Sequence, residues 1–289
     1  GAKIREATAA PYQFNWVVAR IASHRITARA IDNEGASSSS AAVVIRVMPE
    51  TGTAALYLDG VDDYATLGRS SALGLRQFTL ETWFRKEMGG SAGSSGSGGV
   101  SVIPLIANGR GENDNDTFNC NYLFGIRASD GVLAADFEEG PGGSAPGLNH
   151  PVAGVTPVTE GVWHHAAATY DGTTWRLYLD GNLEAELTVG QETAWNTIQH
   201  FALGTSLDSA GVPQGFLHGM LDETRVWDHA RSISEIRSAM KSEVPTASGL
   251  IARYGMSDVN GTTLPSTGSA AANATLMGGV FRTTGAPLT

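Results

Sequence analysis

Three aspartates lie close together in the segment LYLDGVDDYATL, residues 56–67, and their spacing allows chemistry. Asp59, Asp62 and Asp63 fall within five residues, between two stretches whose apolar residues favour β-strands. Carboxylates placed in this way could belong to a solvated turn, to an acid/base pair or to a site for a hard cation. The rest of the sequence must decide among these three possibilities.

A fourth carboxylate, Asp222, lies in LDETRVW, residues 221–227, at a position that we expect to face inward from its strand. An ionised carboxylate on an inward face costs free energy unless it is paired or binds a metal. Ca²⁺ takes roughly six to eight oxygen ligands, backbone carbonyls included. We therefore predict a structural Ca²⁺ held by the turn aspartates Asp59, Asp62 and Asp63 together with Asp222. The alternative is an aspartate turn and a separately hydrogen-bonded Asp222.

The surrounding sequence predicts many short strands and few helices. Clusters of Gly, Ser, Thr, Asn and Asp recur between short apolar runs, and the chain has 36 glycines. The segment LYLDGNLEAEL is a predicted hairpin with Asp180 and Gly181 at its turn. The strongest helix signal is SISEIRSAM, in which Ser232 is the predicted N-cap and Glu235 completes a capping box.

Residues 1–50 differ in residue pattern from the rest of the chain. The segments APYQFNW, residues 10–16, and HRITARAIDNEG, residues 24–35, alternate as strands do, and AAVVIRV is rich in β-branched residues. They resemble the C-terminal half of a bacterial immunoglobulin-like module, which would lack the first strands of its sandwich. Open strand edges favour pairing, so we expect residues 1–50 to pair with another segment or another chain. The matching residues are Pro11, Tyr12, Phe14, Trp16, Ala30, Asp32, Asn33 and Gly35.

The segment MPETGT, residues 48–53, is the predicted boundary, so that residues 51–289 form the second domain. The Gly/Ser-rich stretch at residues 88–100 has the composition of a linker, but strands are predicted on both sides of it. We expect it to be the long loop of one hairpin, because flexible loops lengthen at little cost in entropy.

The second domain resembles the laminin-G-like, concanavalin A-like jelly-roll domains of bacterial secreted proteins. This resemblance implies an all-β fold, a two-sheet antiparallel jelly-roll sandwich. Many domains of this family hold a structural calcium near the motifs that contain Asp59 and Asp222. The segments that carry the resemblance are LYLDGVDDYATL, FTLETWFRKE, GVWHHAAATYDGTTWRLYLDG, GMLDETRVWDHARSISEI and LIARYGMSDVNGTTLPSTG.

We do not expect an enzyme. Glycoside hydrolysis needs two carboxyl groups that flank a cleft. The concanavalin A-like glucanases carry theirs on one strand as E-x-D-x-x-E, a string that this chain lacks. The nearest text, FEEGPG at residues 137–142, has the composition of a loop.

Four further polar residues have weaker claims to a site. His164 and His165 are adjacent on a predicted strand, so they face opposite sides and cannot share a metal. We expect one to be a hydrogen-bonded core residue and the other to lie at the surface. Asp114 and Asp116 could form a second, weaker calcium site, although a solvated hairpin tip is the favoured interpretation. Cys120, the single cysteine, is expected to be a small buried apolar residue.

Two tryptophans are candidates for ligand binding. Trp175 and Trp195 lie near predicted turns, where an indole could stack on a sugar ring or on a partner surface.

Composition excludes several classes of function. The net charge is −10, whereas nucleic-acid binding needs a basic surface. No apolar run approaches the ~20 residues of a membrane-spanning helix. We predict a non-catalytic extracellular or bacterial cell-surface module for adhesion or binding, with a carbohydrate or protein ligand. The alternatives are a structural subunit of a surface assembly and an accessory domain of a large secreted hydrolase.

Overall fold

The computed structural model describes residues 3–10, 12, 23–46, 53–113, 118–259, 261–270 and 272–289. The chain forms two compact units, residues 1–50 and residues 51–289. Among the described residues, no helix has both the length and the apolar character needed to cross a membrane.

The first unit contains two antiparallel ribbons. Their strands are β1 (Ser23–Ile26) with β4 (Val43–Arg46), and β2 (Arg29–Ile31) with β3 (Ser37–Ser39). Asp32 shapes the turn of the second ribbon, because its Oδ1 accepts hydrogen bonds from the backbone N–H groups of Glu34 and Ala36. The immunoglobulin-like assignment of this unit stays a prediction, and its Pro11, Phe14 and Trp16 lie outside the described residues.

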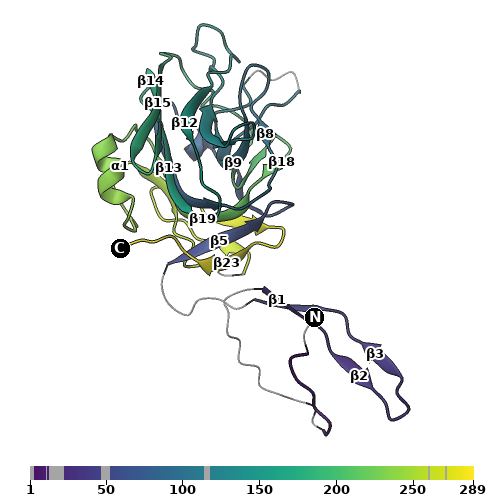
Figure 1. The fold of residues 1–289 in the computed structure, drawn as a ribbon. Helices are drawn as coiled ribbons and strands as arrows, with labels where there is room; N and C mark the ends of the chain where they lie inside the picture. Colours follow the sequence, from purple (N-terminus) through teal and green to yellow (C-terminus); the bar gives the residue numbers. More distant parts are fainter. Residues whose placement is uncertain are drawn as a thin grey trace. The chain divides into compact units, whose positions relative to one another are not determined.

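The second unit is built on two large antiparallel sheets (Figure 1). The nine-stranded sheet runs in the order β12, β11, β10, β9, β16, β6, β22, β21, with β8 beside β9. Its strands are β6 (Tyr64–Arg69), β8 (Gly93–Ser94), β9 (Ser101–Asn108), β10 (Tyr122–Arg127), β11 (Val132–Asp136), β12 (Val152–Pro157), β16 (His200–Leu203), β21 (Thr263–Leu264) and β22 (Ala274–Met277).

The eight-stranded sheet runs in the order β15, β14, β13, β7, β19, β5, β23, with β20 beside β19. Its strands are β5 (Ala54–Asp59), β7 (Phe78–Lys86), β13 (Trp163–Tyr170), β14 (Thr174–Leu179), β15 (Asn182–Thr188), β19 (His218–Trp227), β20 (Leu250–Tyr254) and β23 (Phe281–Thr284). The remaining elements are the ribbon of β17 (Thr205–Leu207) and β18 (Pro213–Phe216), the 3₁₀ turn η1 (Ser71–Leu73) and the helix α1 (Ile233–Ala239).

Inward-facing side chains of both sheets form one core between them. Strand residues alternate between the two faces of a sheet, so each strand supplies every second residue to this core. An aromatic cluster lies inside it, with ring centroids 4.8–6.2 Å apart, and consists of Phe78, Tyr122, Phe137, Tyr170 and Trp175. The fold confirms the predicted all-β, two-sheet jelly-roll sandwich.

Two local predictions are confirmed. The turn between β14 and β15 consists of Asp180 and Gly181, both with positive φ, as a two-residue hairpin turn requires. Ser232 caps α1, and Glu235 completes the capping box. Ile236 of α1 packs with apolar residues of β13 and β14, so the helix lies on the outer face of the eight-stranded sheet (Figure 1).

The predicted hairpin around the Gly/Ser stretch is wrong. β7 belongs to the eight-stranded sheet and β9 to the nine-stranded sheet, so the chain crosses from one sheet to the other. The connecting residues carry the short strand β8, which pairs with β9, and they stay within the second unit. Both flanking strands have the residue pattern of a strand, and that pattern alone does not tell which sheet each one joins.

Candidate functional site

The turn between β5 and β6 brings three carboxylates together. One oxygen of each of Asp59, Asp62 and Asp63 lies within 4.8 Å of the other two. Asp59 and Asp62 are exposed, whereas Asp63 is buried. In the part of the chain that the structure describes, no other group of three His, Cys, Asp or Glu side chains is as close.

Backbone N–H groups already use several oxygens of this turn. Asp59 Oδ1 accepts from the N–H of Val61 at 2.8 Å, and Asp63 Oδ2 accepts from the N–H of Asp59 at 3.1 Å. Asp63 Oδ1 accepts from the N–H of Gly279, which ties the turn to the one between β22 and β23. Burial raises the pKa of Asp63, and the neighbouring carboxylates add to that effect. Asp62, by contrast, accepts no hydrogen bond from the described residues, so its carboxylate remains available to a cation.

Asp222 does not join this turn. In the register of β19 with β5, His218 lies opposite Asp59 and Leu221 lies opposite Leu56. Asp222 is therefore four residues further along the ladder from Asp59, or roughly 13 Å at the rise of a β-strand. The prediction that Asp222 shares one site with the turn aspartates is therefore wrong, because this register places Asp222 too far from them.

The Asp222 carboxylate is instead satisfied by the backbone. It is fully buried, and its two oxygens accept hydrogen bonds of 2.8 Å from the N–H groups of Glu223 and Ala286. The pKa of Asp222 is raised to about 7, chiefly by burial and also by the nearby charges of Glu223 and Glu243, whereas the N–H donors act in the opposite direction. Asp222 fastens the C-terminal segment to β19.

Other buried carboxylates of the eight-stranded sheet are paired with arginines under α1. Glu81 Oε1 accepts from Arg231 at 2.7 Å and lies 3.4 Å from Arg225. Glu223 binds Arg225 at 2.9 Å and also pairs with Arg253. All five side chains are at most 8% exposed. They form a structural ion network rather than an open site.

The two histidines face opposite sides of β13, as predicted. His164 Nδ1 lies 2.8 Å from Asp180 Oδ2. His165 is buried, its Nδ1 has no hydrogen-bond partner, and its Nε2 lies 3.8 Å from Glu81 Oε2. Burial lowers the pKa of His165 to about 4, so the ring is neutral. The predicted core histidine is therefore present but lacks the hydrogen bond that we expected.

The structure separates the two candidate tryptophans. Trp175 is fully buried in the aromatic cluster and donates its Nε1–H to the His150 carbonyl, so the prediction of ligand stacking by Trp175 is wrong. Trp195 is partly exposed, but the Arg76 guanidinium lies over its ring, 4.3 Å from the centroid. Its Nε1–H also donates to Glu192. A ligand would have to displace Arg76 from that face of the indole.

Cys120 is buried as predicted, and its thiol pKa is raised well above the usual range, chiefly by burial. Asp114 and Asp116, the predicted second calcium site, lie outside the described residues.

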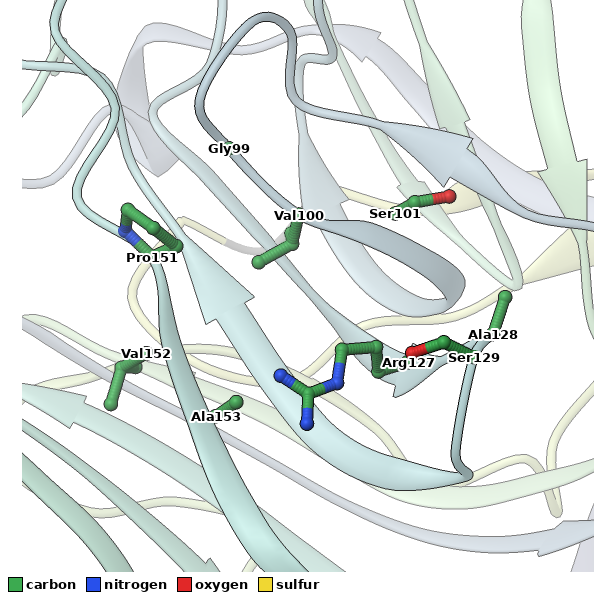
Figure 2. Close-up of a pocket in the computed structure, with 9 residues that line it drawn as sticks. All are labelled: Gly99, Val100, Ser101, Arg127, Ala128, Ser129, Pro151, Val152 and Ala153. Carbon is green, nitrogen blue, oxygen red and sulfur yellow. The ribbon is translucent and has the colours of Figure 1, made fainter.

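One open hollow of about 660 Å³ escaped the sequence reasoning. It lies on the outer face of the nine-stranded sheet, between the first residues of β9 and of β12, and Arg127 at the end of β10 extends into it (Figure 2). We name it the β9–β12 hollow, and its lining residues are Gly99, Val100, Ser101, Arg127, Ala128, Ser129, Pro151, Val152 and Ala153. No motif marks it, because three separated segments form it and none contains an aromatic residue.

The Arg127 guanidinium is held in place from outside the hollow. Its Nε and Nη2 donate to the two carboxylate oxygens of Asp130, at 2.9 and 2.5 Å. This hydrogen bonding also raises the pKa of Arg127 and lowers that of Asp130, so both groups are charged. A bidentate pair fixes the plane of the guanidinium and leaves other N–H groups to point elsewhere.

Comparison with known proteins is consistent with the fold. The model of the concanavalin A-like lectin/glucanases superfamily matches residues 58–237. A putative carbohydrate binding protein from Bacteroides ovatus has a similar structure, with a TM-score of 0.56 and 16% identity over 92% of this chain and 70% of that one. A heptameric SAP-like pentraxin from Limulus polyphemus has a TM-score of 0.49 and 13% identity over 82% of this chain and 97% of that one.

One curated relative matches over a short segment. It is the rat (Rattus norvegicus) sushi, von Willebrand factor type A, EGF and pentraxin domain-containing protein 1, which is 30% identical over 93 residues. The match covers 29% of this chain and only 3% of that protein.

Proposed function

The chain belongs to the concanavalin A-like lectin/glucanases superfamily, and from that premise we propose that it is a non-catalytic extracellular module that binds carbohydrate in the β9–β12 hollow. The observation that carries this proposal is the Arg127 guanidinium, which extends into a solvent-open hollow of about 660 Å³ (Figure 2). A hollow of this size has room for a small ligand.

The chemistry of the lining suits a polar ligand. Arg127, Ser101 and Ser129 offer N–H and O–H groups to the hydroxyl or carboxylate oxygens of a sugar, and Val100 and Ala153 offer small apolar surfaces. Because Asp130 fixes the guanidinium before the ligand arrives, little rotamer entropy is lost on binding. The structural similarity to a putative carbohydrate binding protein supports the choice of sugar over protein as ligand.

A glycan array followed by calorimetry with the strongest glycan tests this proposal. Arg127→Ala should weaken binding at least about tenfold, because it removes the charged donor of the hollow. Arg176→Ala is the matched control, since Arg176 is likewise partly exposed and ion-paired but lies on β14 in the other sheet. An array without signal for the wild-type protein, or equal affinity for both variants, would contradict the proposal.

We also propose that the turn aspartates Asp59, Asp62 and Asp63 hold a structural Ca²⁺. Their clustered oxygens suit a hard cation, and a cation would offset the repulsion among three carboxylates within one short turn. Such an ion would strengthen the connection between the β5–β6 turn and Gly279. Asp62→Asn should reduce the rise in melting temperature that calcium produces, and an unchanged rise would count against this site.

The first unit supports a second candidate function, association with another chain in a surface assembly. Val43, Val44 and Ile45 of β4 are consecutive and are 60%, 52% and 40% exposed. Successive strand residues point to opposite faces, so both faces of β4 are uncovered. Light scattering of the whole chain should show self-association that Val44→Asp weakens, whereas a monodisperse monomer would exclude association between copies of this chain.

A further inference from the structure

A buried group of oxygens lies under the Gly/Ser segment, beside the β9–β12 hollow and away from the turn aspartates. Asp136 and Glu138 are two residues apart and lie on the outer side of the nine-stranded sheet. On this side a small apolar cluster, separate from the main core, contains Ala134. Asp136 is fully buried and Glu138 is 5% exposed. The connection between β7 and β9 folds over them.

Two acceptor oxygens in this group have no hydrogen-bond partner. They are Oδ1 of Asp136 and Oδ1 of Asn149, and both atoms are removed from solvent. Asp136 Oδ2 accepts from the Ser95 hydroxyl, and Asn149 uses its Nδ2 to donate to the Ser97 carbonyl. A buried acceptor without a donor costs about 1–3 kcal/mol, and a buried charge without a partner costs more.

The oxygens converge on Gly99. A Cβ at this position would lie 2.1 Å from Ser95 Oγ, 2.3 Å from Asp136 Oδ2 and 3.0 Å from Asn149 Oδ1. Because 2.3 and 3.0 Å add to 5.3 Å, Asp136 Oδ2 and Asn149 Oδ1 are at most 5.3 Å apart, about the span of two ligands of one Ca²⁺ at 2.3–2.6 Å. The unpartnered Oδ1 of Asp136 belongs to the same carboxylate. Glu138 Oε1 lies beside Gly96, 3.8 Å from the Cβ position there, and the Asn149 Nδ2 is 3.6 Å from the same position.

The charge around these oxygens is negative. Asp136 makes no ion pair with the Lys, Arg or His side chains that the structure describes, and the charge of Glu138 adds repulsion. Burial is the main cause that raises the pKa of Asp136 to about 7. The hydrogen bond from Ser95 and the nearby backbone N–H groups of His150 and Phe137 offset only part of this rise. Oxygen donors, negative charge and exclusion of water are the conditions that favour a hard divalent cation.

We propose that Asp136, Asn149 and Ser95 form a second Ca²⁺ site, to which Glu138 adds negative charge. The bound ion would fasten residues 93–99 to the end of β11. Gly99 also lines the β9–β12 hollow (Figure 2), so the ion would hold one wall of that hollow in place. The site does not depend on the hollow binding a sugar, nor on an ion at Asp59, Asp62 and Asp63.

Calorimetric titration of CaCl₂ into EDTA-treated, desalted protein tests this site. Asp136→Asn should bind one equivalent of Ca²⁺ fewer than the wild-type protein, or should bind that equivalent at least tenfold more weakly. Asp228→Asn, at an exposed aspartate next to the end of β19, should bind as the wild type does. Equal stoichiometry and affinity in the wild-type protein and Asp136→Asn, including no binding by either, would overturn the proposal.

Asp62→Asn separates this site from the turn aspartates, because it should remove a different equivalent. If Asp62→Asn has no effect and Asp136→Asn does, the turn site fails and the site at Asp136 stands. Hydrogen exchange gives a second readout: Ca²⁺ should slow exchange of the amides at residues 93–100 in Asp62→Asn but not in Asp136→Asn. If Asp136→Asn does not fold, Asn149→Ala replaces it with the same expected loss.

Discussion

The two large sheets differ in whether their buried carboxylates are paired with arginines. In the eight-stranded sheet, Glu81 and Glu223 are surrounded by the guanidinium groups of Arg225, Arg231 and Arg253. In the nine-stranded sheet, Asp136 is just as deeply buried, yet it has no ion pair among the described residues. Glu81 Oε2 and Asp136 Oδ1 both lack a hydrogen-bond donor, so the difference lies in the guanidinium charge beside Glu81.

This difference shows what each region can do. A carboxylate that is already matched by buried arginines holds the fold together and has no free charge to offer a ligand. An unmatched buried carboxylate must take up a proton or bind a cation. Asp222 of the eight-stranded sheet also lacks an arginine, but backbone N–H groups bind both of its oxygens. The comparison therefore identifies Asp136 of the nine-stranded sheet, which has neither an ion pair nor a donor for its Oδ1, as the place to search for a bound ion.

The largest loss of stability should come from Glu81→Gln. Glu81 Oε1 accepts from Arg231 and from the indole N–H of Trp227 at 2.9 Å, so the substitution leaves buried guanidinium charge without a partner. We expect a loss of about 3–5 kcal/mol in the free energy of unfolding, measured with urea. Glu186→Gln, at the exposed pair with Arg176, should cost at most about 1 kcal/mol. Equal losses in the two variants would remove the basis of the comparison.

Asp222→Asn should change the pH dependence of stability. The unfolded chain loses the Asp222 proton near pH 3.8, whereas the folded protein keeps it up to about pH 7. Between these values the folded state binds more protons, so this group makes the free energy of unfolding fall as pH rises, by up to about 4 kcal/mol. Urea melts from pH 4 to pH 7 should show a shallower fall in Asp222→Asn. If stability falls with pH equally steeply in the wild-type protein and in Asp222→Asn, Asp222 does not titrate in this range.

The smallest effect, of opposite sign, is expected at Asp136. At pH 8 in EDTA, Asp136→Asn should raise the free energy of unfolding by about 1–3 kcal/mol, because it removes an unmatched buried charge and supplies N–H donors to nearby acceptors. Asp130→Asn, at an exposed pair, should not stabilise the protein. A destabilisation of Asp136→Asn as large as that of Glu81→Gln would mean that the two sheets do not differ in this respect.

The sequence predicted those parts of the fold that depend on neighbours along the chain. Residue alternation predicted the all-β architecture, Asp180 and Gly181 predicted a hairpin turn, and Ser232 with Glu235 predicted a helix start. The cluster of Asp59, Asp62 and Asp63 could also be predicted, because their spacing alone keeps them together. The partners that lie far away in the sequence could not be predicted in this way.

The pairing register of the strands and the face that each strand turns toward the core decided the remaining features. Asp222 was expected beside the turn aspartates, but the pairing of β19 with β5 places His218 there instead. Trp175 was expected near a surface because it follows a turn, but its strand directs the ring into the core. The first error arises because a strand's sequence does not specify which residue of a neighbouring strand lies opposite. The second arises because it does not specify which face of the strand the other sheet covers.

The sequence by itself determined that this chain folds into short antiparallel strands with tight turns, because the period-two pattern and the turn residues act over a few positions. Only the tertiary structure decided that the Gly/Ser segment covers Asp136 and that three separate segments line the β9–β12 hollow. The physical reason is that burial and charge matching depend on which distant segments meet, and those meetings are set by the packing of the two sheets.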